Sequence, residues 1–310
     1  MSEVKHNKRI WEIDFVRGVL IIGMLVDHFM FFLGNLLPGI FANTSIPEWL
    51  MNTSNFAHAY WEHPAKLAVR YFGLLLFFTL VGISSRFSKS NLKRGLLTFG
   101  FGVAMAIFLL VFSTISGIHY YALFPIIACL GACMLIYYGA KQLFVKAIKI
   151  KEDYWKWWSL GIGCAIVATG AVINLVLATV PLRFGNIFLT IMGCYTPGIW
   201  NSDQALEPIK YPLVILGVEK WGNDWLGLMP YAGFTFIGGF IGEHFYKEKK
   251  SLFFRTNEEK NLAFNDKANE VTKPVNWLGN KTIWVYILHP FILIPPLFIL
   301  FWIATGQWPF

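Results

Sequence analysis

Residues 12–32 read EIDFVRGVLIIGMLVDHFMFF, and this stretch decides the fold. It is apolar and long enough to cross the hydrocarbon core of a bilayer, which takes about 20 residues of α-helix. It nevertheless carries five ionisable residues, namely Glu12, Asp14, Arg17, Asp27 and His28. A charged residue at the centre of a membrane helix costs roughly 2.5–3.5 kcal/mol on insertion scales. The stretch is therefore predicted to be a membrane span whose ionisable groups have a function.

The composition of the whole chain favours the same class of protein. Hydrophobic residues make up 56% of the 310 residues and aromatic residues 17%, whereas charged residues reach only 14%. Soluble domains usually have about 25% charged residues. We therefore predict an all-α, polytopic transmembrane helix bundle. The formal net charge is +8, but the basic residues fall in short clusters between apolar runs, which is typical of topology signals, so no nucleic-acid site is predicted.

The apolar runs predict about seven spans and one domain. The candidate spans are residues 11–36, 66–86, 95–115, 119–139, 157–180, 226–246 and 281–304. Two shorter apolar segments, near 185–200 and 211–218, contain Pro and Gly and are predicted to be re-entrant or interfacial. We expect residues 1–310 to form a single integral membrane domain, with a polar cytoplasmic linker at about 247–276.

The distribution of Lys and Arg predicts the orientation. With the N-terminus inside, most basic residues fall in cytoplasmic segments, and the outer side carries only Lys66, Arg183, Lys210 and Lys220. This matches the positive-inside rule for a protein of the cytoplasmic membrane. Seven spans would put the C-terminus outside. The first apolar segment is too long for the apolar region of a signal peptide, is interrupted by Asp14 and Arg17, and lacks a cleavage site, so we expect it to remain as the first span.

Asp14 and Arg17 lie near the predicted cytoplasmic boundary of this span. They are three residues apart, so they share one helix face and can pair. Two interpretations stay open at this point. The pair anchors the end of the helix, with Arg17 reaching lipid phosphates, or it forms the mouth of an anion site for a phosphorylated cofactor.

The outer half of the membrane is predicted to hold the chemistry. Ionisable residues at membrane depth usually face a bundle interior or a cavity and are functional candidates, and His is the usual acid or base near neutral pH. We assign Asp27, His28 and His58 as catalytic candidates. A second group is either catalytic or structural and comprises His63, His119 and His289. The His spacings and the four Cys match no metal motif, so no metal is predicted.

Several segments together resemble a known family. RIWEIDFVRGVLIIGMLVDH (9–28) is similar to the opening signature of membrane acyltransferases related to heparan-alpha-glucosaminide N-acetyltransferase, in its short bacterial branch. Further similar segments follow in the family's order: LLLFFTLVGIS (74–84), SNLKRG (90–95), GIHYYALFPIIACL (117–130), the segment 228–253 and WLGNKTIWVYILHPFIL (277–293). HAYW (58–61) resembles the family's outward His-x-x-Trp piece. The resemblance therefore favours His58 as the base, whereas depth in the membrane favours His28.

The resemblance implies transfer of an acetyl or other acyl group across the membrane. The donor would be cytoplasmic acyl-CoA, and the acceptor an amine or hydroxyl of an extracytoplasmic sugar-type molecule. A His would act as general base, with Asp27 orienting it. The donor's phosphates would meet a polar cytoplasmic edge formed by Arg9, Asp14, Arg17, Arg86, Lys93 and Arg94. Candidate hydrogen-bond donors to the tetrahedral oxyanion are Tyr120, Tyr121, Asn174 and Tyr231, and the sequence selects none of them.

The main alternative is a proton-coupled secondary transporter that uses Asp27 and His28 as a proton relay. An inverted repeat, which many such transporters contain, is not apparent in the sequence. A non-catalytic scaffold in contact with membrane lipid is the least favoured class. The sequence leaves open the acceptor, the acyl chain, the choice between a ping-pong and a ternary mechanism, and the formation of a homodimer.

Overall fold

The computed structural model describes residues 10–116, 121–199, 207–222, 224–247, 251–252 and 267–308. Contacts divide the chain into two compact units. The terminal unit comprises Met1–Gly73 and Lys249–Phe310, and the central unit comprises Leu74–Glu248. The prediction of a single domain is not tested by this division and stays a prediction.

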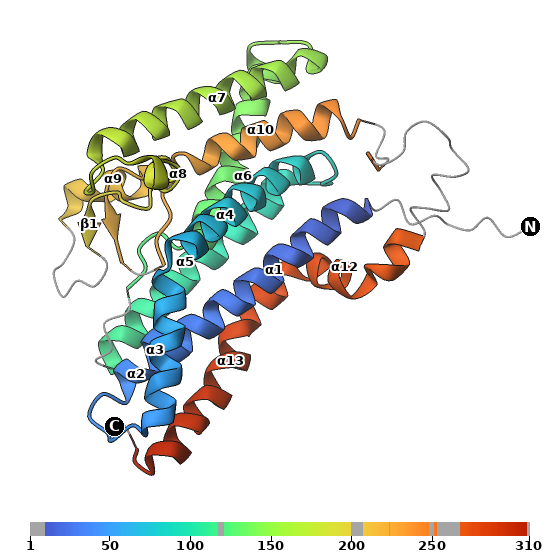
Figure 1. Cartoon of the computed structure of the whole chain (residues 1–310). Helices are drawn as coiled ribbons and strands as arrows, with labels where there is room; N and C mark the ends of the chain where they lie inside the picture. Colours follow the sequence, from blue (N-terminus) through green and yellow to red (C-terminus); the bar gives the residue numbers. More distant parts are fainter. Residues whose placement is uncertain are drawn as a thin grey trace, which may run out of the picture. The chain divides into compact units, whose positions relative to one another are not determined.

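The terminal unit is built around α1 (Trp11–Phe31), which continues through the π-helical turn η1 (Phe32–Leu36) into α2 (Leu37–Ile40). Three further helices complete it, together with the first part of α4 (Pro64–Ser85): α3 (Glu48–Glu62), α12 (Lys273–Asn280) and α13 (Thr282–Thr305). α13 and α12 pack along α1, and α3 packs on η1 (Figure 1). Leu37, Phe41, Leu50 and Phe301 are fully buried in the apolar core between these elements.

A glycine in η1 explains how α3 is held against the end of α1. A side chain at Gly34 would collide with the backbone of Ala57 and His58, so only glycine lets the two backbones approach this closely. The π-helical turn begins two residues earlier, and π-helical turns inside helices are frequently found at functional sites. The turn and the close approach together place Asn35, the next residue, beside α3.

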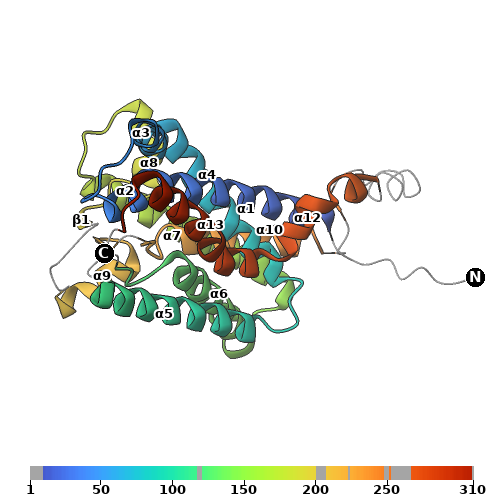
Figure 2. The ribbon, with the colours of Figure 1, turned by 90° about the horizontal axis from the view of Figure 1, so that it is seen from below.

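The central unit contains the rest of α4 and four long helices: α5 (Asn91–Ser116), α6 (Ile126–Gln142) with its extension η2 (Leu143–Ala147), α7 (Glu152–Leu177) and α10 (Tyr231–His244). α5 lies beside α6, and α10 packs against α7 (Figures 1 and 2). At the second contact Gly163 of α7 faces Gly233 of α10, where an added side chain on either would meet backbone. Small residues at helix crossings are common in membrane proteins.

Short elements fill the chain between α7 and α10. They are η3 (Phe184–Asn186), α8 (Ile187–Ile191), β1 (Gly198–Ile199), η4 (Pro208–Lys210), α9 (Tyr211–Leu216) and β2 (Lys220–Trp221). β1 and β2 pair in parallel, with Gly198 opposite Lys220. Lys220 is buried and donates a hydrogen bond to the carbonyl of Cys194, and its burial lowers the pKa of Lys220 to about 8. The segments predicted as re-entrant or interfacial are thus broken into short helices, as their Pro and Gly content indicates.

The structure confirms an all-α polytopic bundle but corrects the number of spans. Within the described residues six helical segments are long and apolar enough to cross a membrane: Trp11–Ile40, Pro64–Ser85, Asn91–Ile115, Ile126–Ala147, Glu152–Leu177 and Thr282–Thr305. The predicted span 226–246 is represented by α10, which has 14 residues. At about 1.5 Å per residue this helix is shorter than the roughly 30 Å hydrocarbon core.

The start of α10 explains the error in the predicted span. Pro230 is the N-cap, and the apolar residues before it belong to an irregular segment rather than to the helix. The predicted linker 247–276 lies largely outside the described residues, and its last residues begin α12 at Lys273. The predicted orientation of the termini stays a prediction.

Candidate functional site

The terminal unit brings together two histidines that are far apart in the sequence. His28 on α1 and His289 on α13 have ring centroids 4.5 Å apart in an edge-to-face arrangement. His28 Nδ1 is 2.9 Å from the Met24 carbonyl oxygen, and His289 Nδ1 is 2.6 Å from that of Tyr286. A carbonyl only accepts, so each Nδ1 carries a proton and each neutral ring keeps its lone pair on Nε2. The pair can therefore accept protons, although His289 is only 4% exposed.

Asp27, the neighbour of His28, has different partners from those predicted. Its Oδ1 lies 3.0 Å from Lys66 Nζ, and its Oδ2 accepts a hydrogen bond of 2.8 Å from Arg70 Nε. The carboxylate of Asp27 therefore pairs with Lys66 and Arg70 and does not orient His28 as predicted. Adjacent helix residues point about 100° apart, which directs the carboxylate toward α4 instead.

An aromatic ring of α3 completes this arrangement of charges. Lys66 Nζ lies 3.6 Å and Arg70 Cζ lies 3.5 Å from the ring centroid of Trp61. Cations near the face of a Trp ring are attracted by its quadrupole. We call Asp27, Lys66, Arg70 and Trp61 the Asp27 cluster. Beside it, burial and the charge of Asp27 raise the pKa of Tyr60.

His58 on α3 is held by the π-helical turn. Its Nδ1 is 2.8 Å from Asn35 Oδ1, an acceptor, so Nδ1 carries the proton and Nε2 is left with its lone pair. The His58 side chain is exposed, in contrast to His289. Trp61 follows three residues later and therefore lies on the same face of α3. This places an oriented and accessible base next to the Asp27 cluster.

Of the two remaining histidine candidates, His63 is not part of this arrangement. His63 lies at the junction of α3 and α4, where its Nδ1 accepts a hydrogen bond of 3.3 Å from the Ala65 backbone N–H. This contact supports the turn between the helices. His119 lies outside the described residues, as does Arg9 of the predicted cofactor site.

The predicted cytoplasmic edge contains paired charges in both units. In the terminal unit, Arg17 Nη1 and Asp14 Oδ1 form the expected ion pair at 3.2 Å. In the central unit, Arg94 donates a hydrogen bond of 3.4 Å to the Ser84 carbonyl, whereas the Lys93 side chain is exposed.

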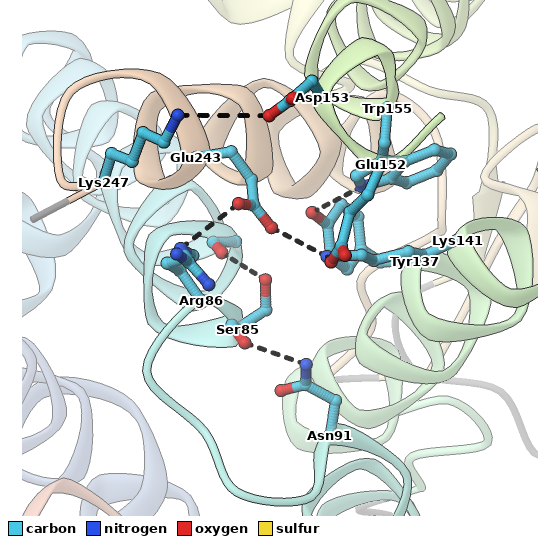
Figure 3. Close-up of polar contacts among 11 residues, drawn as sticks. Ser85, Arg86, Asn91, Tyr137, Lys141, Glu152, Asp153, Trp155, Glu243 and Lys247 are labelled. Carbon is cyan, nitrogen blue, oxygen red and sulfur yellow. Dashed lines mark hydrogen bonds and ion pairs between the residues drawn. The ribbon is translucent and has the colours of Figure 1, made fainter. Parts of the chain in front are cut away.

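Arg86 belongs to a charge cluster that the sequence did not indicate (Figure 3). Glu243 on α10 lies between two cations, 3.2 Å from Arg86 Nε and 2.8 Å from Lys141 Nζ. Lys141 is also 3.5 Å from Glu152, whose side chain is 72% exposed. The central cluster (Arg86, Lys141, Glu243) therefore joins the end of α4 to α6 and α10, and Glu152 balances its second cation.

Replacing Glu243 with Gln is expected to destabilise the protein by roughly 1–3 kcal/mol, because two partly buried cations lose their shared carboxylate. Thermal unfolding of the detergent-purified protein measures the effect. Glu152→Gln is the matched control, and its expected change stays within about 0.5 kcal/mol because its ion pair is exposed. Equal effects of the two variants would show that the central cluster contributes no more than a surface pair.

The predicted oxyanion donors have structural roles where they are described. Asn174 Nδ2 donates to the Ile191 carbonyl at 2.9 Å and its Oδ1 accepts from Thr196 at 3.3 Å. Tyr231 donates its hydroxyl hydrogen bond to the Met192 carbonyl at 2.9 Å. The ring of Tyr121 packs against Trp221, and Tyr120 lies outside the described residues. Among the described residues there is no group of three or more His, Cys, Asp or Glu that could hold a metal ion.

Four residues that shape this site have no site role in the sequence-based prediction: Asn35, Trp61, Lys66 and Arg70. Trp61 ends HAYW (58–61), the segment that resembles the His-x-x-Trp piece of a known family, and the sequence also contains a signal for two of the others. Lys66 and Arg70 are four residues apart, so they share one face at the start of an apolar helix. A buried carboxylate such as that of Asp27 requires a cationic partner. The contact between Asn35 and His58 leaves no comparable pattern.

Comparison with known proteins gives one match. A family described as heparan-alpha-glucosaminide N-acetyltransferase, catalytic, matches residues 9–291. No curated protein and no solved structure gives a significant match. The matched segment includes every described residue of the Asp27 cluster, the Asn35–His58 pair and the two paired histidines.

Proposed function

Because the chain belongs to the heparan-alpha-glucosaminide N-acetyltransferase catalytic family, we propose that it transfers an acetyl group from acetyl-CoA to a sugar-type acceptor. The family and the six apolar helices make the chain an acetyltransferase of the membrane type. To this assignment the proposal adds acetyl-CoA as the donor, a sugar-type molecule as the acceptor and a histidine as the base. The transfer would take the acetyl group from the cytoplasmic to the outer side of the membrane, in line with the distribution of Lys and Arg.

The central unit offers groups suited to the phosphates of the donor. Arg86 and Lys141 are candidate ligands of these phosphates, although both already pair with Glu243 and Lys141 also pairs with Glu152; the exposed side chain of Lys93 is a third cation. Arg17 of the terminal unit is a further candidate, although Asp14 already neutralises much of its charge. Acetyl-CoA supplies an acetyl group activated as a thioester.

The hydrogen bond between His58 and Asn35 carries the assignment of the base. It fixes the Nδ1–H tautomer, and the exposed ring presents a basic Nε2 to an acceptor. Nε2 takes the proton of the acceptor amine or hydroxyl while that atom forms its bond to the acetyl carbon. The carbon–sulfur bond of the thioester breaks, and the protonated imidazole returns its proton to the departing thiolate of CoA.

A second assignment places the base at His28. The observation that favours it is its ring contact with His289, whose Nε2 is buried and has no hydrogen-bond partner among the described residues. The burial of His289 makes this pair harder for an acceptor to reach than His58. We therefore keep the pair of His28 and His289 as the second candidate for the base. One assay compares His28 with His58.

Substitution of Asn35 tests the orientation of His58. In Asn35→Ala, kcat is expected to fall by less than the roughly 10²–10⁴-fold that loss of a whole general base costs, with an unchanged KM for acetyl-CoA. In Asn35→Asp, the added carboxylate stabilises the imidazolium, so the acidic limb of the kcat profile is expected to move to higher pH. CoA release with glucosamine as acceptor is the measurement.

Binding of acetyl-CoA by the purified protein separates the acetyltransferase from the proton-coupled transporter. If saturating acetyl-CoA neither binds nor shifts the thermal stability of the purified protein, the acetyltransferase proposal fails for this donor. Uptake of a solute into proteoliposomes without CoA release would then favour the transporter. A normal pH profile in Asn35→Asp, with activity intact in Asn35→Ala, would instead reject His58 as the base.

A further inference from the structure

An open groove of about 710 Å³ follows the exposed face of α7 in the central unit. It is lined by the aromatic rings of Tyr154, Trp157 and Trp158 and by the small residues Gly161 and Ala165. Residues three or four apart share one face of a helix, so these side chains follow one another along α7. At about 1.5 Å per residue the groove extends roughly 20 Å, which is more than one leaflet of the roughly 30 Å hydrocarbon core.

The two indole rings of this groove, which we call the α7 groove, are held in place by other elements of the central unit. The ring centroid of Trp157 lies 5.3 Å from that of Phe240 on α10, and Trp158 lies 5.2 Å from Phe144 on η2. Both indoles nevertheless stay about half exposed. A Cβ atom added at Gly161 would meet no heavy atom of the described residues within 4 Å. The space beside the rings is therefore open to an apolar chain.

Lysines gather at the end of the groove where α7 begins. Lys151 lines the groove and is the N-cap residue of α7. Lys146 and Lys149, shortly before it in the chain, are exposed. Lys156 lies one turn into the helix, with its Nζ 5.9 Å from the ring centroid of Trp157. An anion at this end of the groove can therefore be reached by several flexible ammonium groups.

The acidic residues of the same segment do not cancel this charge. Residues 146–156 contain four lysines and two acidic residues, Glu152 and Asp153, so a formal excess of two positive charges remains. Both acidic side chains also have cationic partners outside the segment. Glu152 lies 3.5 Å from Lys141 of α6, and Asp153 lies 4.0 Å from Lys247.

A phospholipid with a negatively charged head group fits both ends of the groove. Its acyl chain suits the apolar part, and clusters of Lys beside membrane helices attract anionic lipids. Trp and Tyr are enriched where the hydrocarbon meets the head groups, which is where this end of α7 is expected to lie. A second copy of the chain fits less well. Two copies in one bilayer have the same orientation, so a two-fold contact through this face would bring the same lysines together.

We propose that the α7 groove is a binding site for an anionic phospholipid, with its acyl chain along Gly161 and Ala165 and its phosphate at Lys151. The rings of Tyr154, Trp157 and Trp158 cover the part of the lipid between them. This site belongs to the central unit and does not depend on the proposed reaction.

Native mass spectrometry of the full-length protein, purified in detergent and depleted of lipid, tests the site. Dioleoyl phosphatidylglycerol or dioleoyl phosphatidylcholine is added back in increasing amounts. The wild type is expected to bind the first phosphatidylglycerol about 5- to 30-fold more tightly than phosphatidylcholine, which is what one or two lysines near the head group contribute. Lys151→Gln is expected to reduce this preference about fivefold. Equal dissociation constants of the two lipids for the wild type would overturn the inference.

Matched variants separate the groove from the rest of the membrane surface. Gly161→Leu fills the groove and is expected to weaken binding of both lipids several-fold. Gly100→Leu adds the same side chain at an exposed site on α5, where an added Cβ likewise meets nothing within 4 Å among the described residues, and is expected to have no effect. Lys89→Gln removes an exposed lysine between α4 and α5 and is the control for Lys151→Gln.

Thermal unfolding shows whether each variant is folded, and a folded Gly161→Leu protein with unchanged lipid binding would reject the site. Two other occupants would also overturn the inference. A second copy of the chain in the groove would give a dimer that Gly161→Leu dissociates, with no preference between the two lipids. Displacement of phosphatidylglycerol by acetyl-CoA, which also carries phosphates, would assign the lysines to the donor instead.

Discussion

The His58→Ala variant is expected to lose roughly 10²–10⁴-fold in kcat for acetyl transfer, the usual contribution of a positioned general base. Within the described part of the chain, His58 is the histidine that is both exposed and fixed in one tautomer by a side chain, through its 2.8 Å contact with Asn35. Removal of the ring leaves no proton acceptor next to the acceptor amine. Binding of acetyl-CoA is expected to persist, because the candidate phosphate-binding residues are untouched.

The measurement is CoA release under saturating donor, together with the shift in thermal stability that acetyl-CoA produces. His28→Ala is assayed beside it, and His244→Ala serves as the control because His244 is an exposed histidine at the end of α10. A full loss of turnover in His28→Ala with an active His58→Ala protein would assign the base to the pair formed by His28 and His289. Normal turnover in both variants would reject both His58 and His28 as the base.

Hydropathy predicted the spanning helices well because a bilayer requires long apolar segments. The predicted spans 66–86 and 281–304 differ by only one or two residues from the helices Pro64–Ser85 and Thr282–Thr305. The segment 226–246 failed because hydropathy does not distinguish an apolar helix from an apolar loop that leads into one. Pro230 marked this boundary, since proline lacks a backbone N–H and favours the first positions of a helix.

The side-chain partners were much harder to predict than the spans. The ionisable residues of α1 could be identified, because charges at membrane depth are costly, but their partners come from other helices. Asp27 was assigned to the neighbouring His28, whereas tertiary packing directs it to Lys66 and Arg70, about 40 residues later in the chain. Asn35 depends on a π-helical turn and on the close approach at Gly34, and neither has a reliable sequence pattern.

The Asp27→Ala variant is expected to have the largest effect on stability. Removal of this carboxylate leaves Lys66 and Arg70 largely buried without a counter-ion, and loss of one partner from a buried ion pair costs about 3–5 kcal/mol. Arg70→Ala is expected to cost less, because Asp27 then keeps Lys66 at 3.0 Å. Asp153→Asn is the matched control, since Asp153 is 89% exposed and 4.0 Å from its partner Lys247.

Thermal unfolding in detergent is expected to give the lowest Tm for Asp27→Ala, a higher Tm for Arg70→Ala and a value near that of the wild type for Asp153→Asn. The cause is tested by combining Asp27→Ala with Lys66→Met and Arg70→Met, because apolar residues of similar volume often replace a buried charge cluster without loss of stability. We expect this triple variant to recover most of the lost Tm. A triple variant less stable than Asp27→Ala alone would mean that Asp27 acts through packing and not as a counter-ion.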